Sequence, residues 1–236
     1  MAFLRLERLV KYFGGLAAVN GVSFDVARGE IFGLIGPNGS GKTTIFNMIS
    51  GYHRPTSGRV VFDGREIHRL PTFRICKLGI GRTFQVVKPL GRMSVLDNVI
   101  ASAFARVNTM REARELALKT IAFCGMSPVK DQLAKALPIA GRKRLEIARA
   151  MATRPELLLL DETAAGLNPT ELLEAIDLIR KIRDGGTTVV IIEHIMHVIM
   201  TISDRIHAIN FGQTIAEGTP AEVAANAAVI EAYLGK

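Results

Sequence analysis

Hydrophobic and polar positions in the first part of the chain follow patterns that predict strands. Residues 4–10 and 22–26 alternate between apolar and polar side chains, as strands with one buried face do. Residues 31–36, IFGLIG, are continuously apolar and end in glycine, which indicates a strand buried on both faces. Helical spacing of apolar residues follows over residues 43–51, and a further strand over residues 58–63 closes with an Asp-Gly turn.

The pattern changes in the middle of the chain. From about residue 89 to 137 the strand signal fades, and residues 110–125 place apolar side chains at helical spacing, which predicts a helical satellite. Residues 156–162, ELLLLDE, return to the pattern of a buried strand. An amphipathic helix is then predicted over residues 171–186, and a strand over residues 187–194.

The last part of the chain adds a hairpin and a helix. Residues 205–218 form two short strand patterns around a turn at residues 211–213, and one helix is expected over residues 221–235. Along the whole chain, strands therefore alternate with helices. Such alternation predicts an α/β fold with a mainly parallel sheet.

Composition limits the classes of protein that fit. Apolar residues make up 48% of the 236 residues, and the formal net charge of +8 favours an anionic partner, although scattered basic residues also fit a plain basic surface. The two cysteines, Cys76 and Cys124, lack metal-binding spacing and fit a reducing compartment. The charged N-terminus is no signal peptide, and Glu193 with two histidines interrupts the longest apolar stretch, so we expect a soluble chain without a membrane span.

The segment GPNGSGKT, residues 36–43, lies between a predicted buried strand and a predicted helix. This is the full GxxxxGK[ST] phosphate loop in the strand–loop–helix context that the motif requires. Its glycines allow backbone N–H groups to turn towards phosphate oxygens, and the start of the helix adds a favourable dipole. Lys42 can reach the β- and γ-phosphates, and Thr43 can ligate Mg²⁺. The predicted nucleotide-binding residues of the loop are Gly36, Pro37, Asn38, Gly39, Ser40, Gly41, Lys42, Thr43 and Thr44.

Two acids, Asp161 and Glu162, end the hydrophobic strand LLLLDE. At the carboxyl end of a parallel strand, such side chains reach the ligand crevice. We predict that Asp161 holds Mg²⁺ through water and that Glu162 polarises the attacking water. Two acids that only cap a strand are the alternative, which is weak beside a phosphate loop. A guanine-binding NKxD motif is absent from the sequence, and this disfavours a GTPase.

These motifs together resemble the ATP-binding subunits of ABC transporters over essentially the whole chain. RTFQ places Gln85 at the Q-loop glutamine of that family, IIEH places His194 at its H-loop histidine, and AAGLNP, residues 164–169, matches its D-loop. KYFGG puts Phe13 where the family stacks an aromatic ring on adenine, with Tyr12 as the alternative. The resemblance implies catalytic roles for Glu162, His194, Gln85 and Lys42, and Mg²⁺ binding by Thr43, Gln85 and, through water, Asp161.

The resemblance also implies a fold. It is the α/β fold of P-loop NTPases, with a parallel-sheet core, an antiparallel β subdomain and an inserted α-helical subdomain. Within a single ABC ATPase domain, residues 1–88 and 155–236 would form the RecA-like core with the β subdomain, and residues 89–154 the helical subdomain. KYFGGLAAVNGVSF, GRTFQVVKPLGRMSVLDNV and the terminal VIEAYLG resemble the branched-chain amino-acid type, including its relatives for amides and urea.

The family signature, LSGGQ followed by a basic helix, falls on LPIAG, residues 137–141. Pro138 stands where the family serine contacts the γ-phosphate of ATP held by the partner subunit, and proline offers no donor. Ile139, Ala140 and Gly141 replace two glycines and a glutamine. Their backbone N–H groups can still point at an anion, but two side chains now crowd the approach. The resemblance therefore implies a degenerate signature that acts in trans.

Charged residues around these motifs leave open interpretations. On the basic helix after the signature, Glu146 is expected to form surface pairs with Arg142 and Arg149. Five basic residues flank Gln85 and either face a membrane subunit or anionic lipid, or form a solvated surface. These five residues are Arg74, Lys77, Arg82, Lys88 and Arg92.

We therefore expect an ATP-binding, ATP-hydrolysing subunit of an ABC importer for branched-chain amino acids or related small solutes, at the cytoplasmic face of the membrane. Its cofactors would be ATP and Mg²⁺, and its partners transmembrane permease subunits, a second ATP-binding subunit and, through the permease, a solute-binding protein. That second subunit is identical or different; the altered signature beside intact phosphate-loop motifs favours a different one.

The sequence alone is also compatible with other functions. A nucleic-acid-acting ATPase of the same superfamily would need an insertion for which 236 residues leave no room, so no nucleic-acid partner is expected. An ATP-binding subunit with a degenerate signature that acts mainly as a nucleotide-gated scaffold stays open. An ABC-type ATPase for another substrate stays open as well.

Overall fold

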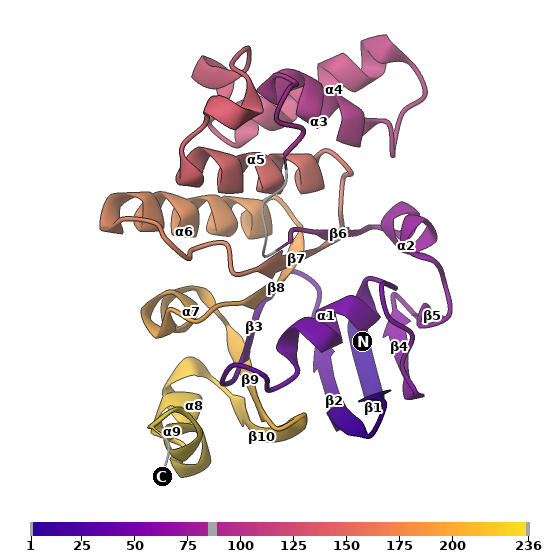
Figure 1. The fold of residues 1–236 in the computed structure, drawn as a ribbon, viewed down its shortest axis with the longest axis vertical. Coiled ribbons are helices and arrows are strands. Elements are labelled where there is room, and N and C mark those ends of the chain that lie inside the picture. Colours follow the sequence, from indigo (N-terminus) through magenta and orange to yellow (C-terminus); the bar gives the residue numbers. More distant parts are fainter. Residues whose placement is uncertain (1, 85–88, 235–236) are drawn as a thin grey trace.

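In the computed structural model, which describes residues 2–84 and 89–234, six strands form a central sheet (Figure 1). Five of them run parallel, and β10 pairs antiparallel with β9 at one edge. Their order across the sheet is β10 (Gln213–Gly218), β9 (Arg205–Asn210), β3 (Ile31–Ile35), β8 (Thr188–Ile192), β7 (Leu157–Asp161) and β6 (Ile80–Arg82). The predicted parallel α/β sheet is therefore confirmed.

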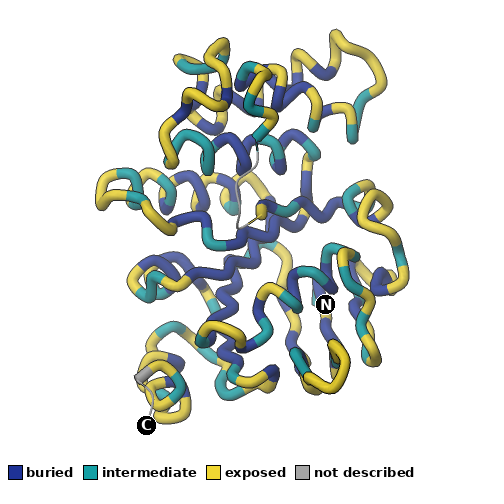
Figure 2. Tube along the Cα trace, viewed as in Figure 1, coloured by how far each residue is buried: buried dark blue, intermediate teal, exposed yellow. Residues whose placement is uncertain are grey.

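The central strands are buried on both faces, as their continuous apolar runs predict. All residues of β3, β7 and β8 are buried, and Figure 2 shows the same burial through the middle of the molecule. Successive side chains of a strand point to opposite faces. Ile31 and Ile35 consequently belong to one hydrophobic core, while Phe32 and Leu34 belong to the other.

A second, antiparallel sheet lies beside the first and contains β2 (Leu16–Val26), β1 (Leu4–Phe13), β4 (Ser57–Phe62) and β5 (Arg65–Glu66). Helix α1 (Lys42–Ile49) shares one hydrophobic core with both sheets, so its apolar face is covered from two sides. The predicted turn between β4 and β5 is present, with Asp63 at φ 47° and Gly64 at φ 74°. Positive φ at both positions matches the twist that a two-residue hairpin needs.

Most of the remaining helices cover the other face of the central sheet (Figure 1), whereas Ile75 of α2 belongs to the core that contains α1. Helix α5 packs on α3 and α4, as the predicted helical satellite requires. The helices, with two short 3₁₀ turns between α4 and α5, are α2 (Thr72–Leu78), α3 (Val95–Ala103), α4 (Met110–Phe123), α5 (Ile139–Met151), α6 (Pro169–Asp184), α7 (Met196–Ile202), α8 (Pro220–Ala225) and α9 (Ala227–Leu234). None of the helices in the described part of the chain combines the length and apolarity needed to cross a bilayer.

The prediction of one helix over residues 221–235 is wrong, because Asn226 divides the segment into α8 and α9. Asn226 has an extended backbone, and its Oδ1 accepts hydrogen bonds from the N–H groups of Ala228 and Val229. Asparagine is among the residues that most favour this N-terminal capping role. The side chain therefore ends one helix and starts the next.

Candidate functional site

The phosphate loop connects the buried end of β3 to the first turn of α1. Gly36, Gly39 and Gly41 have φ values of 154°, 80° and 106°, a region that residues with a side chain rarely adopt. Gly36 also has no room for a side chain, since a Cβ there would lie 2.1 Å from the carbonyl oxygen of Ile209. Positive φ values of this kind are what a loop needs to turn its N–H groups towards an anion.

Lys42 is folded back onto the loop. Its side chain is buried, and its Nζ donates to the carbonyl oxygens of Gly36 at 2.6 Å and Pro37 at 2.9 Å. Burial lowers the pKa of Lys42, while Glu162 and Asp161 oppose that shift. The ammonium group is thus held next to the position where the loop would receive phosphate.

Asp161 lies at the end of β7 in register with Ile192 at the end of β8, which brings it to the same edge as the phosphate loop. Its Oδ2 accepts from Nη2 of Arg82 at 3.1 Å, and both side chains are almost fully buried. Its Oδ1 is buried and has no hydrogen-bond partner among the described residues. Burial raises the pKa of Asp161, and Arg82 acts against this rise. A buried carboxylate oxygen with no partner fits a position that receives a cation.

The placement of Arg82 corrects the interpretation of that residue as part of a solvated surface. The side chain is almost fully buried rather than solvated, because Nη1 donates to Asn47 at 2.7 Å and to Ser50 at 2.9 Å while Nη2 donates to Asp161. Strand β6 pairs with β7, which carries the arginine to the acid. Arg82 therefore ties the end of α1 to the candidate cation ligand.

Glu162 and His194 meet at the carboxyl ends of β7 and β8. Nε2 of His194 lies 2.5 Å from Oε1 of Glu162, and the carboxylate side chain is mostly buried. Glu162 has a φ of 52°, which is unusual for a residue with a side chain, and its N–H donates to the carbonyl oxygen of Ile192. Such a conformation persists only where the surroundings enforce it. The fold brings together two of the four residues for which the resemblance implies catalytic roles.

Neighbouring side chains hold this strained turn from two directions. Nζ of Lys143 on α5 donates to the carbonyl oxygen of Glu162 at 2.9 Å. Oε1 of Glu193 accepts the N–H of Ala164 at 2.6 Å, and burial raises the pKa of this glutamate. Both contacts escaped the sequence analysis, because nothing in the local pattern relates the basic helix or Glu193 to the turn after β7.

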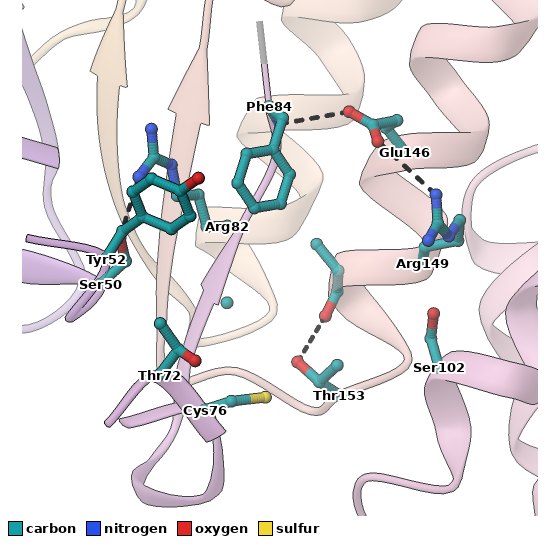
Figure 3. A pocket seen from close by; sticks show the side chains of 12 residues that line it. Ser50, Tyr52, Thr72, Cys76, Arg82, Phe84, Ser102, Glu146, Arg149 and Thr153 are labelled. Atoms are coloured by element: carbon teal, nitrogen blue, oxygen red, sulfur yellow. Dashed lines mark hydrogen bonds and ion pairs between the residues drawn. The ribbon is translucent and has the colours of Figure 1, made fainter. Parts of the chain in front are cut away.

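Gln85 and Lys88 lie outside the described residues. The strand that leads to Gln85 borders a pocket of about 240 Å³, and Figure 3 shows Arg82 and Phe84 on one side of it and Glu146 and Arg149 on the other. Tyr52 and Phe84 reach this pocket and remain more than half exposed. An exposed aromatic rim is a feature of protein interfaces.

The expected surface pairs of Glu146 are only partly correct. Nη1 of Arg149 lies 3.6 Å from Oε1 of Glu146. However, Glu146 is buried, and its Oε2 accepts a hydrogen bond from the N–H of Phe84. The pairing with Arg142 is wrong, because the guanidinium of Arg142 donates to the carbonyl oxygens of Leu137 and Lys135 instead. These carbonyl groups precede the helix, and the arginine closes that turn.

Phe13 is the last residue of β1 and is 44% exposed, and Tyr12 is 46% exposed. The ring of Phe13 meets His53 edge to face at 5.3 Å, and Nζ of Lys11 lies 5.1 Å from its centroid. Both aromatic side chains are therefore available for stacking. The assignment of the adenine contact to Phe13 stays a prediction.

The degenerate signature lies at the start of α5. Pro138 occupies the N-cap position without a side-chain hydrogen bond, and Ile139 is 60% exposed. Ala140 and Gly141 are the next residues of the helix and are half-buried. The first turn of α5 thus presents backbone N–H groups and an apolar side chain to the surroundings.

Comparisons with known proteins place the chain in a family. A family model described as ABC transporter matches residues 19–165, and one described as Branched-chain amino acid ATP-binding cassette transporter matches residues 213–236. The chain is 41% identical to the high-affinity branched-chain amino acid transport ATP-binding protein BraF of Pseudomonas aeruginosa and 40% identical to LivG of Salmonella typhimurium, over 99% of this chain and 98% of each relative. The lipopolysaccharide export system ATP-binding protein LptB of Haemophilus influenzae is 36% identical over 100% of this chain and 98% of its own length.

Solved structures show the same fold. A nucleotide-free ATP-binding cassette from an ABC transporter superposes with a TM-score of 0.92 and 32% identity over the full length of both chains. A dimeric ATP-binding cassette bound to ADP and Pi, in a post-hydrolysis state, gives a TM-score of 0.83 and 26% identity over 92% of this chain and 98% of that one.

Proposed function

The chain belongs to the ABC transporter family of ATP-binding proteins, and from this membership we propose that it is the ATP-hydrolysing subunit of an importer for branched-chain amino acids or related small solutes. The substrate class rests on the relatives that share about 40% of its residues and on the match of its C-terminal segment. The subunit would work at the cytoplasmic face of the membrane, attached through its permease.

One observation carries the proposal of hydrolysis: the phosphate loop, Asp161, Glu162 and His194 lie at one edge of the central sheet. In this arrangement Glu162 would orient the attacking water, and His194 would act on the γ-phosphate. Lys42 and the loop N–H groups would neutralise the charge that develops on the phosphates. Positioning and neutralisation of this kind supply most of the catalysis in phosphoryl transfer.

The residues present also fit Mg²⁺. The unpartnered Oδ1 of Asp161 is a carboxylate oxygen, the ligand type that this ion prefers, and Thr43 is exposed at the start of α1. We propose that Asp161, through water, and Thr43 hold the ion, with Gln85 as the further ligand that the family resemblance implies. Bound there, Mg²⁺ would supply positive charge to the phosphate oxygens.

We propose that the active form is a pair of ATP-binding subunits. The start of α5 lacks the serine hydroxyl that the family uses, and a dimeric cassette is among the similar solved structures. A related subunit with an intact signature would complete the site built by this chain, and the altered signature here would leave the other site weak. An identical partner would give two weak sites.

We place the permease contact at the pocket of Figure 3, because it adjoins the segment that carries Gln85 and has an exposed aromatic rim. Phe84→Ala should reduce co-purification of the chain with its permease several-fold, while ATP binding by the isolated chain stays unchanged. Phe123→Ala removes a similarly exposed ring outside the pocket and serves as the control. Equal recovery of permease with both variants would place the contact elsewhere.

The test of the whole proposal is reconstitution of the chain with the permease, partner ATP-binding subunit and solute-binding protein of its own gene neighbourhood. ATP-dependent uptake of leucine, isoleucine or valine into vesicles is expected. Turnover without uptake of these amino acids, but with uptake of another solute, would keep the ATPase and change the substrate class.

A specific observation supports a second candidate function. Because Pro138 offers no donor to the ATP of a partner, two copies of this chain would bind ATP with little turnover, as a nucleotide-gated scaffold would. The two candidates differ in one measurement. A scaffold would let uptake proceed at an unchanged rate after Glu162→Gln in this chain, whereas a motor subunit would not.

A further inference from the structure

The last helix of the chain touches the phosphate loop. The hydroxyl oxygen of Tyr233 on α9 accepts a hydrogen bond from the N–H of Gly36 at 2.8 Å, across 197 residues of sequence. Gly36 is the first residue of the loop and is buried. A buried backbone N–H needs a partner, and here a side chain from the other end of the chain provides it.

Helix α9 is built to bring that hydroxyl to this place. Asn226 caps its first turn, and Val229 is buried in the hydrophobic core that also contains residues of β3 and β9. Residues four apart on a helix lie on the same face, so the anchored Val229 directs Tyr233 towards the loop. Partial burial raises the pKa of Tyr233, and the hydrogen bond from Gly36 acts against this rise.

Gly36 is held on both of its polar backbone groups. Its N–H donates to Tyr233, and its carbonyl oxygen accepts Nζ of Lys42 at 2.6 Å. On the other side, Ile209 of β9 leaves no space for a side chain. If Lys42 turns to phosphate in the proposed function, the carbonyl oxygen loses its partner, and the bond to Tyr233 is what still fixes the start of the loop.

We propose that Tyr233 is a positioning residue for the phosphate loop, so that the C-terminal helix sets how well the loop accepts ATP. This proposal rests on the proposed nucleotide site and adds a distant residue to it. The hydroxyl of Tyr233 stabilises the inward conformation of the loop before ATP binds. A loop that is already in the binding conformation binds its ligand more tightly, because less ordering is required on binding.

The decisive variant is Tyr233→Phe, which removes the hydroxyl and keeps the ring. Loss of one hydrogen bond of this kind should weaken equilibrium ATP binding by about 3- to 10-fold. In the assembled transporter the KM for ATP should rise by a similar factor, while kcat at saturating ATP stays within about 2-fold. Ile230→Ala, one turn earlier on an exposed face of the same helix, is the control for general loosening of α9 and should leave both values unchanged.

Hydrogen exchange at the Gly36 amide tests the contact without any nucleotide. In the unmodified chain this amide should be protected, and in Tyr233→Phe its exchange should accelerate about 10-fold, while the amide of Leu34 in β3 is unaffected. An unprotected Gly36 amide in the unmodified chain would overturn the proposal outright. Faster exchange with unchanged ATP affinity would also overturn it, because the bond would then have only a structural role. Failure of ATP to bind the unmodified chain would instead refute the proposed function.

Discussion

The phosphate loop and the signature segment are the two regions that a nucleotide would meet, and they are built in opposite ways. The loop is enclosed by its own chain: Lys42 bonds to its carbonyl oxygens, and Tyr233 bonds to Gly36. The signature segment starts a helix at Pro138 without a side-chain cap and exposes Ile139. The phosphate loop is therefore hydrogen-bonded to other parts of its own chain, whereas the first turn of α5 has no side-chain cap.

This difference fits the proposed division of work between two ATP-binding subunits. Glu162, which is proposed to act on the nucleotide of its own chain, is held by long-range contacts to Lys143 on α5 and Ile192 on β8. At the start of α5, Arg142 donates to the carbonyl oxygen of Leu137 within the same turn, and no side chain caps the helix. How well this segment would bind the phosphate of a partner's ATP depends on its hydrogen-bond donors, and the serine hydroxyl of the family is missing here.

The largest effect is expected from removing the negative charge of Glu162, which is proposed to orient the attacking water. Glu162→Gln should retain ATP binding but reduce turnover by about 10²-fold or more, since the side chain keeps its shape and loses its basicity. Phosphate release by the assembled complex and equilibrium ATP binding measure the two effects. Glu115→Gln on the exposed face of α4 is the control. Near-normal turnover would show that the cis half of the site works without Glu162.

A serine hydroxyl restored at position 138 tests the signature segment in the same way. Pro138→Ser should raise ATPase activity of the chain paired with itself, because a charge-assisted hydrogen bond to phosphate contributes about 1.5–3 kcal/mol. Pro138→Ala removes the proline without adding a donor and should give no such increase. The gain should shrink when a related subunit supplies an intact signature. Full activity of the unmodified chain alone, unchanged by Pro138→Ser, would mean that the altered signature is no handicap.

The smallest expected effect concerns the exposed aromatic residues at the end of β1. Phe13→Ala should weaken ATP binding by about 1–3 kcal/mol, the range found when a ring stacked on a base is removed. Titration with ATP measures the loss, and Tyr12→Ala is the matched comparison. Weaker binding in Tyr12→Ala but not in Phe13→Ala would assign the adenine contact to Tyr12.

Local patterns in the sequence were enough to predict the strand and the helix on either side of the phosphate loop. The continuous apolar run of β3, the glycines after it and the helical spacing of α1 are adjacent along the chain, so their arrangement follows from neighbouring residues. The acids at the end of β7 were also predictable, since their strand has the same apolar pattern. The break at Asn226 was missed, because alanine-rich flanks hide a cap that only the backbone conformation reveals.

The sequence by itself determined which functional groups are present: a phosphate loop, two acids after a buried strand, and a signature without its serine. The tertiary structure alone decided which of these groups meet. Arg82 was expected near the surface, yet the pairing of β6 with β7 buries it against Asp161. Tyr233 reaches Gly36 only because the sheet brings β3 beside β9 and α9 packs nearby. Contacts across such sequence distances depend on sheet order and helix packing, and residue patterns read over a few positions do not contain that information.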